Sequence, residues 1–520
     1  MRLFRQAVNL FNRSPWLLSL IIFASALSLF TYLAFDQTFA DPDSFYHAKM
    51  AQVLASRGAL TEFPWLSQTT LRYNFTDHHF LYHLILIPFV KVFPPLIGLK
   101  IATILFASLT ILLVYWLLRQ FLVKGAFWYA LFLLTINPFI FRLNLAKAQG
   151  LVLIFLILLI YLIIHRHYLS LVFLSFFYVW LYGGWPLALM VVGVYAIFNW
   201  LWTFVKSSGT LVKQRRKKIF WQNVILIFCV ALGITEGILL SPYFPRNPDF
   251  YWQQSFKIAL VNYQHLINVG GEWYPYGWLE LMTAASPFFI LFSLAVIIFA
   301  LSFKKQSLNA WFFLALSLIF FALTLKSRRY VEYFVPLSVV FSAVSLNWFW
   351  PTIKQRLEKF VSPNWILILP VLLLMSFSPI FYRDLKAIKL AYQNGFAFDK
   401  FLAPSLWLNQ NSLPGEVVFH SDWDEFPILF YHNDFNYYLV GLDPTFMYES
   451  DPDLYQRWVG ITTGTRTENI YSEIKKLFGA NYVFVDLKDH SALARNLENN
   501  IYFEKVFEDD ESRIYRLSDE

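Results

Sequence analysis

Repeated apolar segments, each close to the length of a bilayer-spanning helix, constrain this chain more than any other feature. About 20 predominantly apolar residues cross the hydrocarbon core of a membrane, and the 520-residue sequence is 58% hydrophobic and only 15% charged. Soluble globular proteins are about 25% charged, so the sequence predicts a polytopic α-helical membrane protein of about eleven transmembrane helices. The predicted spans are 16–35, 98–118, 126–141, 150–165, 168–182, 185–205, 219–240, 285–303, 309–325, 332–350 and 363–381.

Charge divides the chain into two regions. Residues 401–520 hold 21 Asp and Glu against 9 Lys and Arg, whereas the first 400 residues hold 13 acidic against 33 basic residues. We therefore expect a membrane domain over 1–383 and an acidic domain outside the membrane over 384–520, so the net charge of +8 is no evidence for nucleic-acid binding. The single cysteine, Cys229, excludes a disulfide framework and a cysteine zinc site.

The basic residues predict the orientation, because Lys and Arg are retained in cytoplasmic loops. With a cytoplasmic N-terminus every predicted inner loop is basic, and the run QRRKK at 214–218 is the strongest marker. This topology places the segments 36–97 and 241–284 and the C-terminal domain outside, as expected for a prokaryotic plasma membrane. The apolar stretch 79–93 is short for a span and predicts a helix in the membrane interface.

The first chemistry-bearing stretch, DPDSFYH at 41–47, directly follows the first predicted span. Asp41 and Asp43, with His47 nearby, are suited to hold a divalent cation such as Mg²⁺ or Mn²⁺, or to deprotonate an acceptor. Alternatively, Asp43 or Ser44 caps a helix over 45–56.

A second stretch, TDHH at 76–79, is followed by His83. Since His79 and His83 share a helix face, they predict either a two-histidine metal site or polar residues that cap an interfacial helix.

The second outer segment contains a Gly- and aromatic-rich loop, GGEWYPYGW at 270–278. Glu272 supplies a carboxylate, and Trp273 is a candidate to stack on a sugar; the alternative is an aromatic belt at the bilayer surface.

External basic residues break the positive-inside trend at Arg328 and Arg329. Guanidinium groups bind phosphate through paired hydrogen bonds, so these arginines, joined by Arg142 and Lys147 on another outer loop, predict contact with a lipid phosphate. Snorkelling to lipid headgroups is the alternative.

The C-terminal domain reads as mixed α/β, with helices expected over 405–411 and 470–478 and strands over 417–420 and 482–486. The run SDWDEF at 421–426 follows the first strand and is a candidate functional stretch. The alternative interpretation of this acidic run is a solvated loop. No Gly-rich phosphate loop or Ser-His-Asp pattern is present.

Together these stretches resemble the GT-C membrane glycosyltransferases, and most of all the catalytic subunit of oligosaccharyltransferase. The stretch 43–47 is similar to the family's D-x-x-Y-H pattern, so the resemblance implies that Asp43 is catalytic and binds metal, with Asp41 an extra neighbour. The loop around Glu272 is similar to the family's outer acidic motif, and Arg328 or Arg329 to its phosphate-binding arginine. Trp423 and Asp424 match part of the family's W-W-D-Y-G motif, which reads the acceptor.

Two departures accompany the resemblance. The family's second outer loop carries metal-binding acids, whereas residues 142–149 here (RLNLAKAQ) contain none. The other departure is the incomplete W-W-D-Y-G motif.

We therefore expect an inverting transfer of a sugar or glycan from a polyprenyl-phosphate or -diphosphate carrier to a glycan, lipid or protein acceptor on the outer face. The sequence leaves three alternatives open: a protein oligosaccharyltransferase, a lipid or solute transporter, and a non-catalytic envelope scaffold. The central expectation is that Asp43 and Glu272 converge beside the arginines, with a divalent ion between the two carboxylates and His47 as a weaker ligand.

Overall fold

The computed structural model describes residues 15–206, 212–261, 263–360, 372 and 375–518 of the chain. The chain forms two compact units, which are described separately. The first unit comprises Met1–Asp36, Ile101–Ile238 and Glu272–Asn394, and the second comprises Gln37–Lys100, Leu239–Gly271 and Gly395–Glu520.

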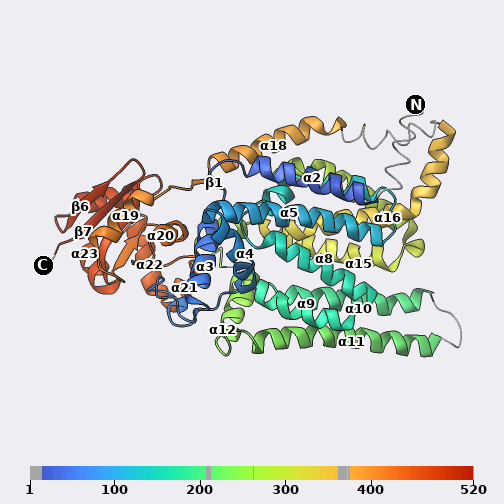
Figure 1. Ribbon diagram of the computed structural model, residues 1–520, viewed down its shortest axis with the longest axis horizontal. Helices are drawn as coiled ribbons and strands as arrows, with labels where there is room; N and C mark the ends of the chain where they lie inside the picture. Colours follow the sequence, from blue (N-terminus) through green and yellow to red (C-terminus); the bar gives the residue numbers. More distant parts are fainter. Residues whose placement is uncertain (1–14, 207–211, 262, 361–371, 373–374, 519–520) are drawn as a thin grey trace. The chain divides into compact units, whose positions relative to one another are not determined.

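The first unit is a bundle of apolar helices that run alongside one another (Figure 1). Helix α16 is central, since it packs against α6, α7, α14 and α15, while α10 packs against α8 and α15. The helices are α2 (Pro15–Leu33), α5 (Pro95–Gln120), α6 (Ala126–Leu133), α7 (Asn137–Leu143), α8 (Gln149–His165), α9 (Tyr168–Leu181), α10 (Pro186–Lys206), α11 (Val212–Leu239), α13 (Trp278–Ala284), α14 (Ser286–Ser302), α15 (Leu308–Thr324), α16 (Val331–Phe360) and α18 (Ser378–Gln393), with short turns η3 (Gly271–Trp273), η4 (Phe303–Lys305) and η5 (Arg328–Tyr330).

The described residues contain six helices that are long and apolar enough to cross a membrane, which indicates an integral membrane protein. They lie at Trp16–Leu33, Pro95–Gln120, Pro186–Phe204, Gln214–Leu239, Ser286–Lys305 and Arg328–Trp350. The predicted span 126–141 is a pair of helices, α6 and α7, bent by 74°.

The predicted spans 150–165, 168–182 and 309–325 are apolar helices of 17, 14 and 17 residues. Most of the predicted span 363–381 lies outside the described residues. A total of eleven spans and their orientation therefore stay predictions, as does the domain boundary at 383/384.

The second unit joins the segments Gln37–Lys100 and Leu239–Gly271 to a mixed sheet. Its five strands lie in the order β4-β3-β5-β7-β6, with β3 parallel to β4 and β5, and β7 antiparallel to β5 and β6. The strands of the unit are β1 (Thr38–Phe39), β2 (Phe396–Ala397), β3 (Val417–His420), β4 (Tyr437–Tyr438), β5 (Ala480–Asp486), β6 (Phe503–Glu508) and β7 (Ser512–Leu517). The strands and helices that we predicted in this region are confirmed, with ends shifted by at most three residues.

The second unit also contains helices. They are α3 (Asp43–Arg57), α4 (Phe80–Val92), α12 (Asn247–Trp252), α19 (Leu402–Asn411), α20 (Phe426–His432), α21 (Thr445–Ser450), α22 (Pro452–Thr462), α23 (Ile470–Ser472) and α24 (Ser491–Glu498), with 3-10 turns η1 (Thr70–Arg72) and η6 (Trp423–Glu425) and π-helical segments η2 (Gln253–Val261) and η7 (Glu473–Leu477). The backbone N–H of Ser67 donates to the carbonyl of Tyr438 at 2.8 Å, and that of Gln68 to Leu439 at 3.0 Å. The segment 36–97 is thus hydrogen-bonded directly to the edge of the sheet.

Candidate functional site

The residues singled out from the sequence form two clusters, one in each unit. In the first unit, the Glu272 cluster consists of Arg142, Lys147, Glu272, Arg329 and Glu332. In the second unit, the Asp43 cluster consists of Asp41, Asp43, His47, Asp422 and Asp424.

Local backbone contacts fix the loop that carries Glu272. The Ser327 hydroxyl donates to the carbonyl of Glu272 at 2.8 Å, and the Arg328 backbone N–H donates to the carbonyl of Tyr274 at 3.0 Å. The Arg328 Nε donates to the carbonyl of Pro275 at 3.2 Å. The loop over 272–275 is therefore tied to the turn η5, which leads into α16.

Arg142 is the centre of the Glu272 cluster. Its Nε and Nη2 donate to Oε2 of Glu332 at 3.0 and 2.9 Å, and its Nη1 donates to Oε2 of Glu272 at 2.6 Å. Arg142 is 3% exposed and Glu332 is 1% exposed. Because buried charges are stable only when paired, these contacts account for a guanidinium among apolar helices.

Glu272 faces three cations. Besides Arg142, the ammonium of Lys147 lies 3.9 Å from Oε2, and Nη1 of Arg329 lies 3.4 Å from Oε1. Burial alone would raise the pKa of the Glu272 carboxyl, but Lys147, Arg329 and Arg142 lower that pKa well below its usual range. Glu272 is therefore ionised at neutral pH.

The two neighbouring arginines that the sequence could not separate face different surroundings. The Arg329 guanidinium lies 4.7 Å from the ring centroid of Trp273, and its buried Nε has no acceptor among the described residues. Arg328 is 41% exposed in its side chain and lies 3.6 Å from Glu280. Arg329 thus belongs to the cluster, whereas Arg328 faces the loop that precedes α13.

Asp43 begins helix α3 in the second unit. The predicted capping role of Asp43 or Ser44 is wrong, because the helix already begins at Asp43 and its N-cap residue is Pro42. Instead Oδ1 of Asp41 accepts from the backbone N–H of Asp43 at 3.0 Å. His47 follows one turn later and so shares a helix face with Asp43.

A buried chain of hydrogen bonds extends from His47. Its Nδ1 lies 2.8 Å from Nε2 of His83, and Nδ1 of His83 lies 2.6 Å from Oδ2 of Asp77. With both imidazoles neutral, His83 donates to Asp77 and accepts from His47, which leaves the lone pair of His47 on Nε2. Since both ring nitrogens of His83 are engaged, this geometry disfavours the predicted His79/His83 metal site.

The C-terminal acidic run lies close to Asp43. Helix α20 packs against α3, with the rings of Phe45 and Tyr431 in edge contact at 5.7 Å. Burial and, to a lesser extent, the neighbouring carboxylates of Asp422, Glu425, Asp43 and Asp41 together raise the pKa of Asp424 to about 8. The structure thus brings Asp424 and Asp43, which are far apart in the sequence, into one electrostatic group.

The other residues of the acidic run have structural contacts. The Asp422 side chain accepts from the backbone N–H of Trp423 at 2.7 Å, which begins the turn η6. Glu425 is buried and accepts from the backbone N–H and the hydroxyl of Ser421. Of the run, Trp423 and Asp424 remain the candidates for contact with an acceptor.

A divalent ion was expected between Asp43 and Glu272, with His47 as a weaker ligand. Among the described residues, no group of three or more His, Cys, Asp and Glu side chains is arranged to hold a metal. The surroundings of Glu272 also oppose one. Unit charges 4 Å apart interact by about 4 kcal/mol at an effective dielectric of 20, so a doubly charged ion on Glu272 would be repelled by about 8 kcal/mol by each cation at that distance.

Asp43 and Glu272 belong to different units, so their convergence stays a prediction. Sequence reasoning assigned no role to Glu332, although an acid in the first turn of a predicted span is a recognised signal of function. It considered His83 as a metal ligand or as a polar residue capping an interfacial helix, and missed its bond to Asp77.

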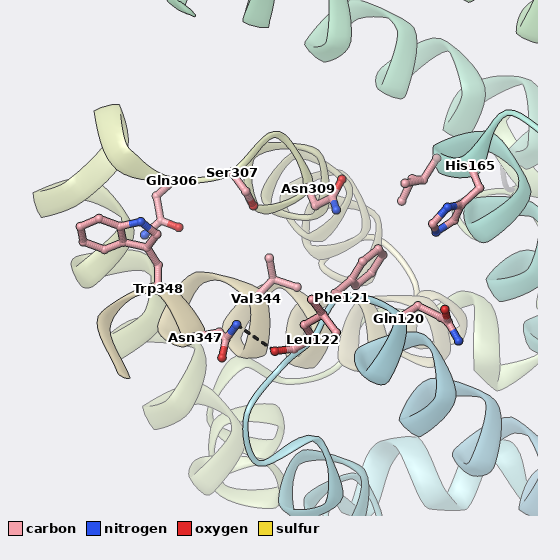
Figure 2. A pocket seen from close by; sticks show the side chains of 11 residues that line it. Gln120, Phe121, Leu122, His165, Gln306, Ser307, Asn309, Val344, Asn347 and Trp348 are labelled. Carbon is pink, nitrogen blue, oxygen red and sulfur yellow. Dashed lines mark hydrogen bonds between the residues drawn. The ribbon is translucent and has the colours of Figure 1, made fainter. Parts of the chain in front are cut away.

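A separate hollow of about 330 Å³ lies in the first unit, beside the ends of α5 and α8 (Figure 2). Its residues are Gln120, Phe121, Leu122, Ile164, His165, Gln306, Ser307, Asn309, Val344, Asn347 and Trp348. No carboxylate and no Lys or Arg is among them, so this hollow lacks the groups that bind and transfer a phosphate-linked sugar.

Comparison of the sequence with protein-family models and with curated proteins gave no match. Solved structures do match. An archaeal oligosaccharyltransferase, AglB from Archaeoglobus fulgidus in complex with an inhibitory peptide and a dolichol-phosphate, is 14% identical with a TM-score of 0.66, over 98% of this chain and 75% of that chain. A crystal form of the A. fulgidus enzyme contains Zn and sulfate.

Two other structural neighbours are not named as oligosaccharyltransferases. ArnT from Cupriavidus metallidurans is 12% identical with a TM-score of 0.54, over 97% of this chain and 98% of that chain. The arabinofuranosyltransferase AftD from Mycobacteria is 13% identical with a TM-score of 0.53, over 98% of this chain and 40% of that chain. All three are GT-C glycosyltransferases, and they match nearly the full length of the sequence. The expected resemblance is therefore confirmed at the level of architecture, and the chain has the fold of the GT-C membrane glycosyltransferases.

Proposed function

We propose that this chain is a membrane glycosyltransferase that takes a sugar or glycan from a polyprenyl-phosphate or -diphosphate carrier and passes it to an acceptor on the outer face of the membrane. The observation that carries the proposal is the Glu272 cluster. Within a GT-C fold, it holds three cations against two carboxylates, and it contains a buried guanidinium nitrogen, Nε of Arg329, without an acceptor among the described residues.

The cluster is suited to bind a phosphate group. Its formal charge is +1, and a guanidinium binds phosphate oxygens through directed hydrogen bonds. Because Arg142 directs three nitrogens at Glu332 and Glu272, we assign it a positioning role. Arg329, assisted by the more exposed Arg328, then contacts the phosphate and stabilises the charge that develops as it leaves.

The reaction is a direct, inverting displacement. Asp43 accepts a proton from the acceptor group as the acceptor attacks the anomeric carbon of the sugar. The bond from the anomeric carbon to the acceptor forms while the bond to the phosphate oxygen breaks, and the electron pair leaves with the polyprenyl phosphate or diphosphate. Asp41 holds the start of α3, and Trp423 and Asp424 contribute to acceptor binding.

A protein oligosaccharyltransferase is the second candidate. The higher TM-score of AglB, 0.66 against 0.54 for ArnT, favours it, whereas only Trp423 and Asp424 of the family's acceptor motif are present. Purified protein offered a lipid-linked glycan with either a sequon peptide or a glycan acceptor separates the two, since only one acceptor should be consumed.

The decisive test is the substitution Asp43→Asn in the purified full-length chain. We expect transfer from a polyprenyl-phosphate-linked sugar to fall by about 100-fold or more, since general base catalysis contributes about 10² to 10⁴. Asp453→Asn, on an exposed carboxylate of α22, is the matched control. If Asp43→Asn folds and retains full transfer, the proposed mechanism is wrong. Uptake of a solute or lipid into vesicles without transfer would instead support a transporter.

A further inference from the structure

We infer that the positive charge beside Glu272 is supplied by Lys147, Arg142 and Arg329, and that Glu272 is a positioning residue for these cations and no metal ligand. The inference rests on the proposed function, because it concerns the same phosphate site. It differs from the sequence-based expectation, in which Glu272 and Asp43 share a divalent ion.

The first observation is that cations face both oxygens of the carboxylate. Oε2 of Glu272 lies 2.6 Å from Nη1 of Arg142 and 3.9 Å from the ammonium of Lys147, and Oε1 lies 3.4 Å from Arg329. Magnesium and calcium take oxygen ligands and are held by accumulated negative charge. The oxygens of Glu272 are instead surrounded by positive charge.

The second observation is the composition of the neighbouring segment. Residues 142–149 carry no acid, and Lys147 stands within them. The Lys147 side chain is 8% exposed, so its ammonium is held in the cluster and is no solvated surface charge. The segment therefore brings a positive charge to Glu272 where additional carboxylates would be needed to bind a metal.

The cluster as a whole has the charge that a phosphate site requires. Three cations and two carboxylates sum to +1, and this charge is present before any ligand arrives. Glu272 and Glu332 make the burial of three cations possible, while Nε of Arg329, which has no acceptor among the described residues, is directed to a phosphate in this assignment. A divalent ion is then unnecessary on this side of the reaction.

The test measures Mn²⁺ binding to the full-length protein in detergent by electron paramagnetic resonance, with Mn²⁺ alone as the probe. We expect the wild type and Glu272→Gln to bind Mn²⁺ identically, including any ion held by the acidic residues of the second unit. A loss of Mn²⁺ affinity of tenfold or more in Glu272→Gln would overturn the inference.

A charge reversal provides the complementary test. Lys147→Glu replaces a cation by a carboxylate beside Glu272 and lowers the charge of the cluster by two units, so we expect the KM for the lipid-linked donor to rise at least tenfold. An unchanged KM in a folded Lys147→Glu protein would refute the place assigned to Lys147. If that variant does not fold, the comparison of wild type with Glu272→Gln still decides.

Activity measurements add a third readout and separate this inference from the proposed function. We expect transfer to persist in excess chelator, Lys147→Arg to retain it, and Lys147→Gln to raise the KM for the lipid-linked donor more than it lowers kcat. The metal-free assignment would be overturned if chelator abolished transfer by the wild type, Mg²⁺ restored that transfer, and transfer by Glu272→Gln were insensitive to chelator. A protein without any transfer would overturn the proposed function, while the Mn²⁺ experiments would still test Glu272.

Discussion

The buried pair of Arg142 and Glu332 allows the sharpest prediction of stability. In Arg142→Met, an apolar side chain of similar length replaces the guanidinium, and the carboxylate of Glu332, which is 1% exposed, loses its two hydrogen bonds of 2.9 and 3.0 Å. Removal of one partner of a buried ion pair costs about 3–5 kcal/mol. We expect the free energy of unfolding to fall by about this amount, because no other cation replaces both bonds.

The double variant Arg142→Met/Glu332→Leu should recover most of the loss. Replacement of a whole buried ion pair by apolar side chains is often neutral or stabilising by about 1–4 kcal/mol. The two substitutions should therefore show a coupling energy of about 3 kcal/mol or more, well above the error of a double-mutant cycle. Some loss should persist, since Glu272 also gives up its bond of 2.6 Å to Arg142.

The assay is equilibrium unfolding in mixed micelles, followed by the fluorescence of the 19 tryptophans. Arg328→Met is the control, because its side chain is 41% exposed and exposed ion pairs contribute about 0–1 kcal/mol. A loss below about 1 kcal/mol in Arg142→Met, or a double variant no more stable than the single one, would show that Glu332 is not held by Arg142 as the structure has it.

Three further predictions concern the second unit. Burial and neighbouring carboxylates raise the pKa of Asp424 to about 8, so the folded state binds the proton more tightly than the unfolded state. The free energy of unfolding should therefore decline as the pH rises from about 4 through 8. Thermal scans should show that Asp424→Asn flattens this decline. His83→Phe should lower the free energy of unfolding by about 3 kcal/mol, because it removes the hydrogen bond from His83 to Oδ2 of the buried Asp77 carboxylate. Asp77→Asn keeps an acceptor for His83 and should lower the free energy of unfolding by less in the same assay. Gly441→Ala should cost about 1–3 kcal/mol, because a Cβ there would lie 2.4 Å from the ring of Phe426; an unchanged unfolding midpoint would contradict that packing.

The apolar segments and the strands of the C-terminal region could be predicted from the sequence, because each depends on local patterns. The strand over 417–420 is a short apolar run with a Gly just before it, and it lies where we expected. The bend between α6 and α7 could not be predicted from hydropathy, since both halves are apolar and only the backbone shows the 74° angle.

The candidate residues were identified by residue type, but their partners were not. Arg142 was expected to bind phosphate, yet its contacts are carboxylates, one of which is 190 residues away in the sequence. The predicted cap of α3 was wrong because the helix begins at Asp43, two residues before the expected start, and Asp41 accepts from the backbone N–H of Asp43. Sequence patterns report which groups are costly to bury, whereas the contacts that stabilise them are formed by packing.

The missing acids of residues 142–149 and the unexpected role of Glu332 have one physical explanation. A site that binds a phosphate must present net positive charge, and this charge is either an ion held by carboxylates or a set of basic side chains. Basic side chains buried among apolar helices need carboxylates for pairing, but fewer carboxylates than cations if charge is to remain for the ligand. Arg142, Lys147 and Arg329 with Glu272 and Glu332 meet this condition. The loss of the acidic motif is then compatible with a working phosphate site, because Lys147 contributes the charge that such acids would otherwise recruit.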